Sequence, residues 1–145
     1  MKFEKIVFLM ITISICTVLI TTQLQTQDSI SALVNNSGPY IGTTIPHDYG
    51  FDGSGIIISV IDTGVDFNHP DLLGLGLEGK IIGGYDFVDN DETPQDFNGH
   101  GTQVAGIIAA NGNLTGIAPN SKILAYRVSE DGESVSSDLI IKAIE

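Results

Sequence analysis

The sequence has one cysteine, no tryptophan and only six lysine and arginine residues among its 145 residues. A single cysteine, Cys16, excludes a disulfide framework and a cysteine-based zinc site within one chain. The six bases stand against 18 aspartate and glutamate residues, for a formal net charge of −12. A negative field of this size repels phosphate backbones and anionic lipid headgroups, so we expect no nucleic-acid binding.

One long apolar run, residues 6–20, lies near the N-terminus and follows Lys2 and Lys5. It is shorter than the roughly 20 residues that cross a bilayer and has the length of a signal-peptide core. We therefore expect residues 1–27 to be a signal peptide and the protein to be secreted. If residues 6–20 stay uncleaved, they are the only expected contact with a membrane.

The rest of the chain divides into a polar, turn-rich lead-in segment, residues 28–55, and a folded part, residues 56–145. The folded part begins with a continuous β-branched run, which is typical of a central parallel strand covered on both faces. Strands then alternate with segments of helical periodicity. The expected elements are strands at 56–61, 81–88 and 123–128, and helices beginning at His100 and at Ser136-Ser137-Asp138. This alternation predicts an α/β fold with a parallel sheet flanked by helices.

Two side chains are placed for chemistry. Asp62 follows the first strand at its carboxyl end, where reacting groups gather in open α/β sheets, and His100 opens the following helix. A carboxylate that accepts a hydrogen bond from a histidine fixes its tautomer, and the pair supplies two members of a nucleophilic triad. Each residue alone is more typical of a turn former or a helix cap.

The surrounding motifs decide between these readings. Asp62 lies in Val60-Ile61-Asp62-Thr63-Gly64-Val65-Asp66, and His100 in His100-Gly101-Thr102-Gln103-Val104-Ala105-Gly106. Both strings resemble the aspartate and histidine motifs of the subtilisin-like serine proteases, in the family's order. The resemblance extends from about Gly50 to Glu145. It implies a serine endopeptidase acting on protein or peptide substrates, in which Asp62 orients His100 and His100 acts as general base and then general acid.

Two further parts of the family pattern are missing from these 145 residues. The family's nucleophile lies in a Gly-Thr-Ser-Met-Ala type segment, and an asparagine between the histidine and the serine helps to bind the oxyanion; neither occurs here. The resemblance therefore implies the front portion of a protease domain, an incomplete subtilisin-like fold. We expect residues 1–145 alone to hydrolyse no peptide.

A second group of polar residues lies in one acidic loop before His100. Five oxygen-bearing side chains occur within ten residues, which is a pattern that can wrap a calcium ion. The loop also resembles the sequence Asp-Phe-Val-Asp-x-Asp-x-Thr-Pro-Gln, with which some thermostable subtilisin-like proteases bind calcium. A solvated acidic loop is the alternative. The predicted ligands of a structural Ca²⁺ are Asp86, Asp89, Asp91, Thr93 and Gln95.

The sequence is also compatible with two other functions. Ile61-Asp62-Thr63-Gly64 also matches the signature of aspartic proteases, and Ile81-Ile82-Gly83 faintly resembles their second motif. That class needs two carboxylates sharing a proton and an all-β chain, and it leaves His100 unexplained. The non-enzyme alternative is a secreted, acidic, calcium-binding remnant of a protease.

Overall fold

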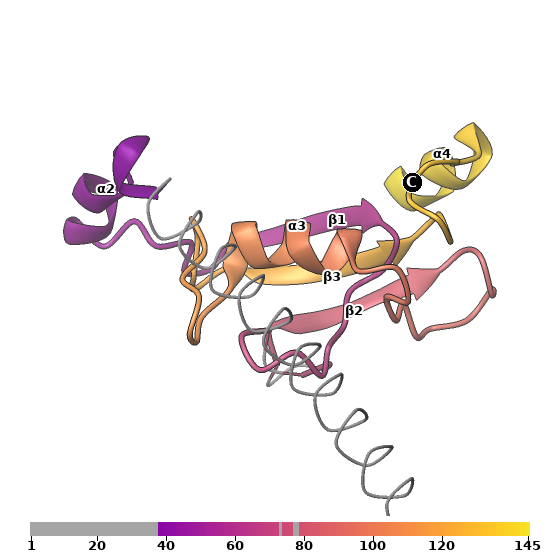
Figure 1. Cartoon of the computed structure of the whole chain (residues 1–145), viewed down its shortest axis with the longest axis horizontal. Helices are drawn as coiled ribbons and strands as arrows, with labels where there is room; N and C mark the ends of the chain where they lie inside the picture. Colours follow the sequence, from indigo (N-terminus) through magenta and orange to yellow (C-terminus); the bar gives the residue numbers. More distant parts are fainter. Residues whose placement is uncertain (1–37, 73, 77–78) are drawn as a thin grey trace, which may run out of the picture. The chain divides into compact units, whose positions relative to one another are not determined.

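A computed structural model describes residues 38–72, 74–76 and 79–145 (Figure 1). The predicted signal peptide, residues 1–27, and Cys16 lie outside the described residues. Within the described ranges, no helix is long and apolar enough to cross a membrane. The elements in chain order are α2 (Thr44–Asp48), β1 (Ile57–Asp62), β2 (Ile81–Asp86), α3 (His100–Ala109), β3 (Lys122–Arg127) and α4 (Ser137–Ile144).

The three strands form one parallel sheet in the order β1-β3-β2. The pairing places Arg127, the last residue of β3, beside the last residues of both neighbours, Asp62 and Asp86. Because parallel strands share their direction, all three carboxyl ends meet at one edge of the sheet. The predicted α/β fold with a parallel sheet and helices is confirmed.

The middle strand among the described residues is β3, whereas the sequence pattern favoured β1 as the central one. Residues 123, 125 and 127 of β3 are buried, while Ile57 of β1 is 56% exposed. The β-branched run predicted a strand correctly, because residues such as Ile58 and Val60 suit a pleated surface. It did not predict the position of that strand, since strand order depends on contacts between distant segments.

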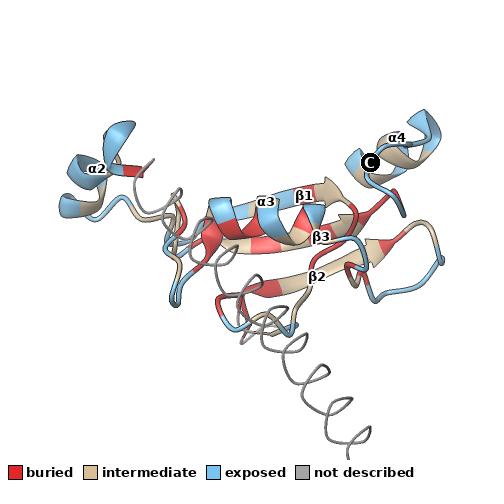
Figure 2. Ribbon diagram, in the orientation of Figure 1, coloured by how far each residue is buried: buried red, intermediate tan, exposed pale blue. Residues whose placement is uncertain are grey.

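Helix α3 packs on β1 and β3 and covers one face of the sheet (Figures 1 and 2). The helix approaches closely because its buried positions are small, namely Gly101, Ala105, Gly106 and Ala109. The core beneath it is formed by Val60, Val65, Leu72, Ile81, Ile123 and Ala125. This packing holds the start of α3 beside the carboxyl end of β1.

The two remaining helices have no buried residues, as Figure 2 shows. Helix α4 begins where Ser136 was predicted to cap it, but the Ser136 side chain makes no capping hydrogen bond. Instead, the backbone carbonyl of Ser136 accepts the N–H groups of Leu139 and Ile140. Helix α2 was not predicted, because five residues in a segment rich in turn formers leave no periodic pattern.

Candidate active site

Asp62 is held at the point where β1 ends and the chain turns away from the sheet. The turn is completed at Gly64, which is buried, has φ +100° and packs against the backbone of Pro94 and Gln95. A Cβ atom at Gly64 would lie 2.7 Å from the Pro94 carbonyl oxygen. The N–H of Val65 donates to that same oxygen at 2.9 Å. Only glycine therefore allows the turn that leaves the Asp62 side chain at the sheet edge.

His100 is presented by the first turn of α3. The next residue, Gly101, lets the helix start touch the strand end, because a Cβ atom there would lie 2.1 Å from the Gly64 carbonyl oxygen and 3.1 Å from Asp62 Cβ. This close approach places the imidazole of His100 within reach of the Asp62 carboxylate.

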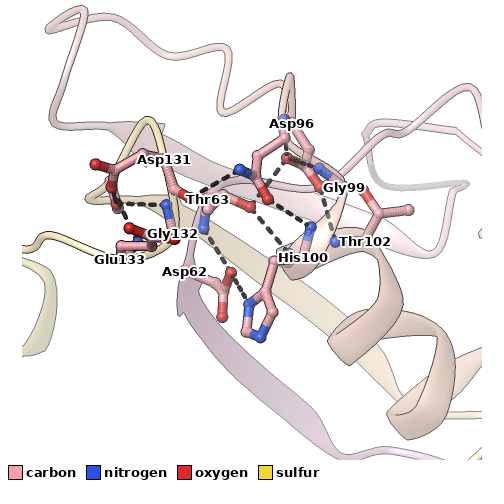
Figure 3. Close-up of polar contacts among 12 residues, drawn as sticks. Asp62, Thr63, Asp96, Gly99, His100, Thr102, Asp131, Gly132 and Glu133 are labelled. Atoms are coloured by element: carbon pink, nitrogen blue, oxygen red, sulfur yellow. Dashed lines mark hydrogen bonds and ion pairs between the residues drawn. The ribbon is translucent and has the colours of Figure 1, made fainter.

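The two side chains meet through a hydrogen bond of 2.7 Å between His100 Nδ1 and Asp62 Oδ1 (Figure 3). Asp62 Oδ1 also accepts the N–H of Thr63 at 2.7 Å. Because an ionised carboxylate only accepts, the imidazole donates from Nδ1 and its Nε2 is free to take a proton. The Asp62 side chain is 17% exposed and that of His100 is 58% exposed, so the free nitrogen is accessible to a reacting group.

The contact raises the pKa of His100 above its ordinary value of 6.5. The largest cause is the hydrogen bond to Asp62, followed by the charge of the same carboxylate, and the charge of Asp96 adds a smaller contribution. Both Asp62 effects favour the imidazolium form. The arrangement therefore suits a histidine that takes a proton from one reacting group and holds it until it is passed to another.

A pocket of about 240 Å³ lies next to the pair. Its charged or titratable lining groups are Asp62, His100 and Glu133, and its aliphatic walls are Ile61, Val128, Val135 and Ile140. Ser129 also lines it, but its hydroxyl lies 2.8 Å from the Ser134 carbonyl oxygen and accepts the Gly132 N–H at 3.0 Å. Ser129 is thus held within its own loop, with no hydrogen bond to His100.

The predicted calcium ligands are only partly brought together. Arg127 Nη1 donates to Asp86 at 2.7 Å and to Asp89 at 2.6 Å, so this guanidinium bridges two of the predicted ligands. Burial lowers the pKa of Arg127, but the hydrogen bonds to the two carboxylates outweigh burial, and the net shift is upward. The other oxygen of Asp86 accepts the N–H groups of Val88 and Asp89. Both oxygens of Asp86 are thus engaged.

The other three predicted ligands are linked to this group through the backbone, because Asp86 and Asp91 exchange two N–H to carbonyl hydrogen bonds, of 2.8 and 3.1 Å. Asp91 Oδ1 accepts the Thr93 N–H at 2.7 Å, and Gln95 Nε2 donates to the Asp96 carbonyl oxygen at 3.1 Å. Among the residues described, no three histidine, cysteine, aspartate or glutamate side chains are grouped to hold a metal ion. The oxygen chemistry suits Ca²⁺, and in this arrangement the guanidinium of Arg127 bridges two of the five predicted ligands, Asp86 and Asp89. Calcium binding stays a prediction.

Sequence reasoning missed two residues near these groups. Arg127 was not connected to the acidic loop, because the pairing of β3 with β2 brings it there. Asp96, 7% exposed, lies in that loop but was not among the predicted site residues. The signal that could have singled it out is its place four residues before a helix start, where carboxylates accept the unpaired N–H groups of the first turn.

Comparison with known proteins agrees with this geometry. The sequence profile described as "Subtilase family" matches residues 53–145, which include both Asp62 and His100. The chain belongs to the subtilase family. This membership and the parallel sheet do not support the aspartic protease alternative, which expects an all-β chain.

Relatives of this subtilase chain include named proteases. It is 42% identical over 131 residues to "Minor extracellular protease Vpr" of Bacillus subtilis (strain 168), covering 82% of the chain and 16% of the relative. It is 55% identical over 87 residues to "Thermitase" of Thermoactinomyces vulgaris, covering 57% of the chain and 29% of the relative. The chain thus spans less than a third of the length of either curated relative.

The fold is also similar to solved subtilase structures. "Crystal structure of a cold adapted subtilisin-like serine proteinase" matches with a TM-score of 0.56 and 43% identity, covering 65% of this chain and 32% of that one. Matches to proteins named as extracellular and as intracellular proteases both occur. Family and fold are thus shown.

Proposed function

We propose that this chain supplies the aspartate and the histidine of a serine endopeptidase that cleaves protein or peptide substrates. The observation that carries the proposal is the 2.7 Å hydrogen bond between His100 Nδ1 and Asp62 Oδ1, at the carboxyl edge of the sheet and beside a pocket. Membership of the subtilase family supports it, since relatives and structural neighbours bear the names of serine proteinases.

In the proposed reaction, His100 Nε2 removes the proton from a serine hydroxyl as the serine oxygen attacks the peptide carbonyl. Asp62 holds the ring in the required tautomer and stabilises the imidazolium that forms. The same proton then passes from Nε2 to the leaving amine, and water repeats the sequence to release the acyl group. No serine of residues 1–145 has the Gly-Thr-Ser setting of the family's nucleophile, so the proposal takes that serine from outside these residues.

The test is labelling of a nucleophilic serine by a fluorophosphonate probe. We expect the protein expressed from the whole reading frame to be labelled, and purified residues 1–145 not to be labelled. Asp62→Asn and His100→Ala should each abolish rapid labelling. In subtilisin, a member of this family for which the values are measured, loss of the aspartate costs about 3 × 10⁴ in kcat and loss of the histidine about 2 × 10⁶.

Asp131→Asn is a matched control, because Asp131 is an exposed carboxylate that bonds only within its own loop. We expect it to label at nearly the parental rate. Labelling of residues 1–145 that depends on His100 would show that the nucleophile lies within this chain. Labelling of the whole protein that survives His100→Ala would remove the proposed role of the pair.

We also propose that the protein is exported. The support is the basic start and apolar run of residues 1–20, together with a relative named as an extracellular protease. Leu9→Arg, within the run, should keep the protein inside the cell because a charge in the apolar core blocks insertion. Leu24→Arg, outside the run, should not. Equal secretion of the two variants, measured by mass spectrometry of the medium, would contradict this proposal.

A further inference from the structure

Asp96 lies between the two segments that carry the Asp62–His100 pair, and it makes no hydrogen bond to either member (Figure 3). One segment is the end of β1 with the turn that follows it. The other is the loop and first turn of α3. Asp96 is 7% exposed, and a buried carboxylate needs hydrogen bonds to offset the loss of water around its charge.

The first oxygen of Asp96 binds both the β1 side and the loop that leads into α3. Oδ1 accepts the hydroxyl of Thr63 at 2.9 Å, and it also accepts the N–H groups of Asn98 and Gly99, each at 2.9 Å. Thr63 is 1% exposed and directly follows Asp62 in the chain. The N–H of Thr63 in turn donates to the Asp62 carboxylate at 2.7 Å. Asp96 therefore fixes the residue that orients Asp62.

The second oxygen of Asp96 binds the α3 side. Oδ2 accepts the N–H of Thr102 at 2.9 Å and its hydroxyl at 2.5 Å. These bonds hold the third residue of the helix that begins with His100. The hydroxyl oxygen of Thr63 completes the hydrogen-bond network by accepting the N–H of Gly101 at 2.9 Å. One carboxylate thus connects both sides of the Asp62–His100 contact.

A helix cap alone does not account for this arrangement. Capping requires only the bonds from Asp96 to the first turn of α3, and those bonds would form without Thr63. The Thr63 hydroxyl adds a connection between the strand and the helix. Its removal leaves every charge unchanged, so its effect can be separated from the electrostatic influence of the Asp96 carboxylate on His100.

We propose that Asp96 is a positioning residue, which holds the end of β1 and the start of α3 at the spacing that the Asp62–His100 hydrogen bond requires, acting through Thr63 and Thr102. The proposal deepens the proposed function, because the pair it positions is the one assigned to peptide hydrolysis. It predicts that loss of either Asp96 or the Thr63 hydroxyl loosens the pair, although neither side chain hydrogen-bonds to the imidazole of His100.

The experiment follows the His100 ring by NMR in the purified 145-residue chain, without any need for hydrolysis. The chain has three histidines, so His47 and His69 serve as internal references. In Asp96→Asn and in Thr63→Val we expect the His100 pKa to fall toward 6.5 and the downfield signal of its Nδ1 proton to be lost through exchange with water. Thr63→Ser, which restores the hydroxyl, should recover both.

Asp131→Asn removes a charge from the loop beside the same pocket and should leave the Nδ1 proton signal in place. Circular dichroism and thermal melting identify any variant that fails to fold. If Asp96→Asn does not fold, the His100 signals of Thr63→Val are compared with those of Thr63→Ser instead. If Thr63→Val leaves the His100 signals unchanged while Asp96→Asn lowers the pKa, Asp96 acts by charge alone and the proposal is overturned. The NMR signals report the Asp62–His100 contact whether or not the protein hydrolyses peptides. Loss of fluorophosphonate labelling with unchanged NMR effects would therefore overturn the proposed protease function but not the positioning role of Asp96.

Discussion

The protonation state of His100 affects both the proposed chemistry and the stability of the fold. Its Nδ1 hydrogen bond to Asp62 favours the protonated ring, and the side chain is accessible to solvent. A base must be neutral to accept a proton, whereas the folded state gains most from the contact when the ring is charged. The same hydrogen bond therefore makes activity and stability depend on pH in opposite directions.

We predict that the contribution of His100 to stability is lost as the pH rises. The pKa of His100 in the folded chain lies above the ordinary value of 6.5 that applies when the chain is unfolded. The folded state then binds the proton more tightly, so the stabilisation is fully present below about pH 6.5 and disappears as the pH passes the folded pKa.

Thermal melting of the parent and of His100→Gln between pH 5 and pH 9 measures this contribution. The gap between the two melting temperatures should be widest at acid pH and should narrow through neutrality. Asp62→Asn should remove most of the pH dependence of the gap, because it removes the acceptor. A gap that is constant, or that widens with pH, would show that the Asp62–His100 contact does not raise the folded pKa.

At the scale of elements, the site depends on how closely the start of α3 approaches the end of β1. We predict that Gly101→Ala destabilises the chain by about 1 to 3 kcal/mol, the usual cost of forcing an extra methyl group into a packed site. The new Cβ would lie 2.1 Å from the Gly64 carbonyl oxygen, and backbone atoms must move to admit it. The shift would also separate His100 from Asp62.

Gly106→Ala, in the same helix, is the matched control for Gly101→Ala. Its Cβ would meet only the Leu114 Cδ2 atom, at 3.8 Å, which is an ordinary contact. Alanine is the better helix former by about 1 kcal/mol, so this variant should be as stable as the parent or more stable. Urea unfolding measures both variants, and equal effects of the two substitutions would show that the close approach at Gly101 is not required.

The elements differ in how far the sequence could predict them. The strands, α3 and the placement of Asp62 and His100 follow from local patterns, since a β-branched run and a helical repeat are visible within a few residues. The bridge from Arg127 to Asp86 and Asp89 joins residues 41 and 38 positions apart. Such a contact depends on strand order, and no local pattern of residues encodes strand order.

The whole molecule has an excess of acidic groups, with a formal net charge of −12. The sequence-based argument for calcium rested on five oxygen-bearing side chains within ten residues of one acidic loop. The structure places a base, Arg127, against Asp86 and Asp89, and leaves Asp91 and Glu92 exposed. Like charges close together oppose a compact state, so a divalent cation still has a physical reason to bind at this loop.

We predict that calcium raises the melting temperature and that Asp91→Asn reduces the gain. A ligand that binds only the folded state stabilises it by about 2.7 kcal/mol at a hundredfold excess over its Kd. Differential scanning calorimetry with CaCl₂, against NaCl at equal ionic strength, separates binding from charge screening. If calcium stabilises the parent and Asp91→Asn equally, the loop is a solvated turn, held by Arg127 without the ion.

The strand order β1-β3-β2 also sets the point at which the sheet beneath the Asp62–His100 pair can close. Strands β1 and β2 pair with β3 and not with each other, and α3 packs on β1 and β3. A chain made only as far as residue 120 already contains Asp62 and His100 but lacks β3. Residues 122–127 must therefore be made before the sheet closes, so the strand that completes the sheet follows both residues of the pair in the chain.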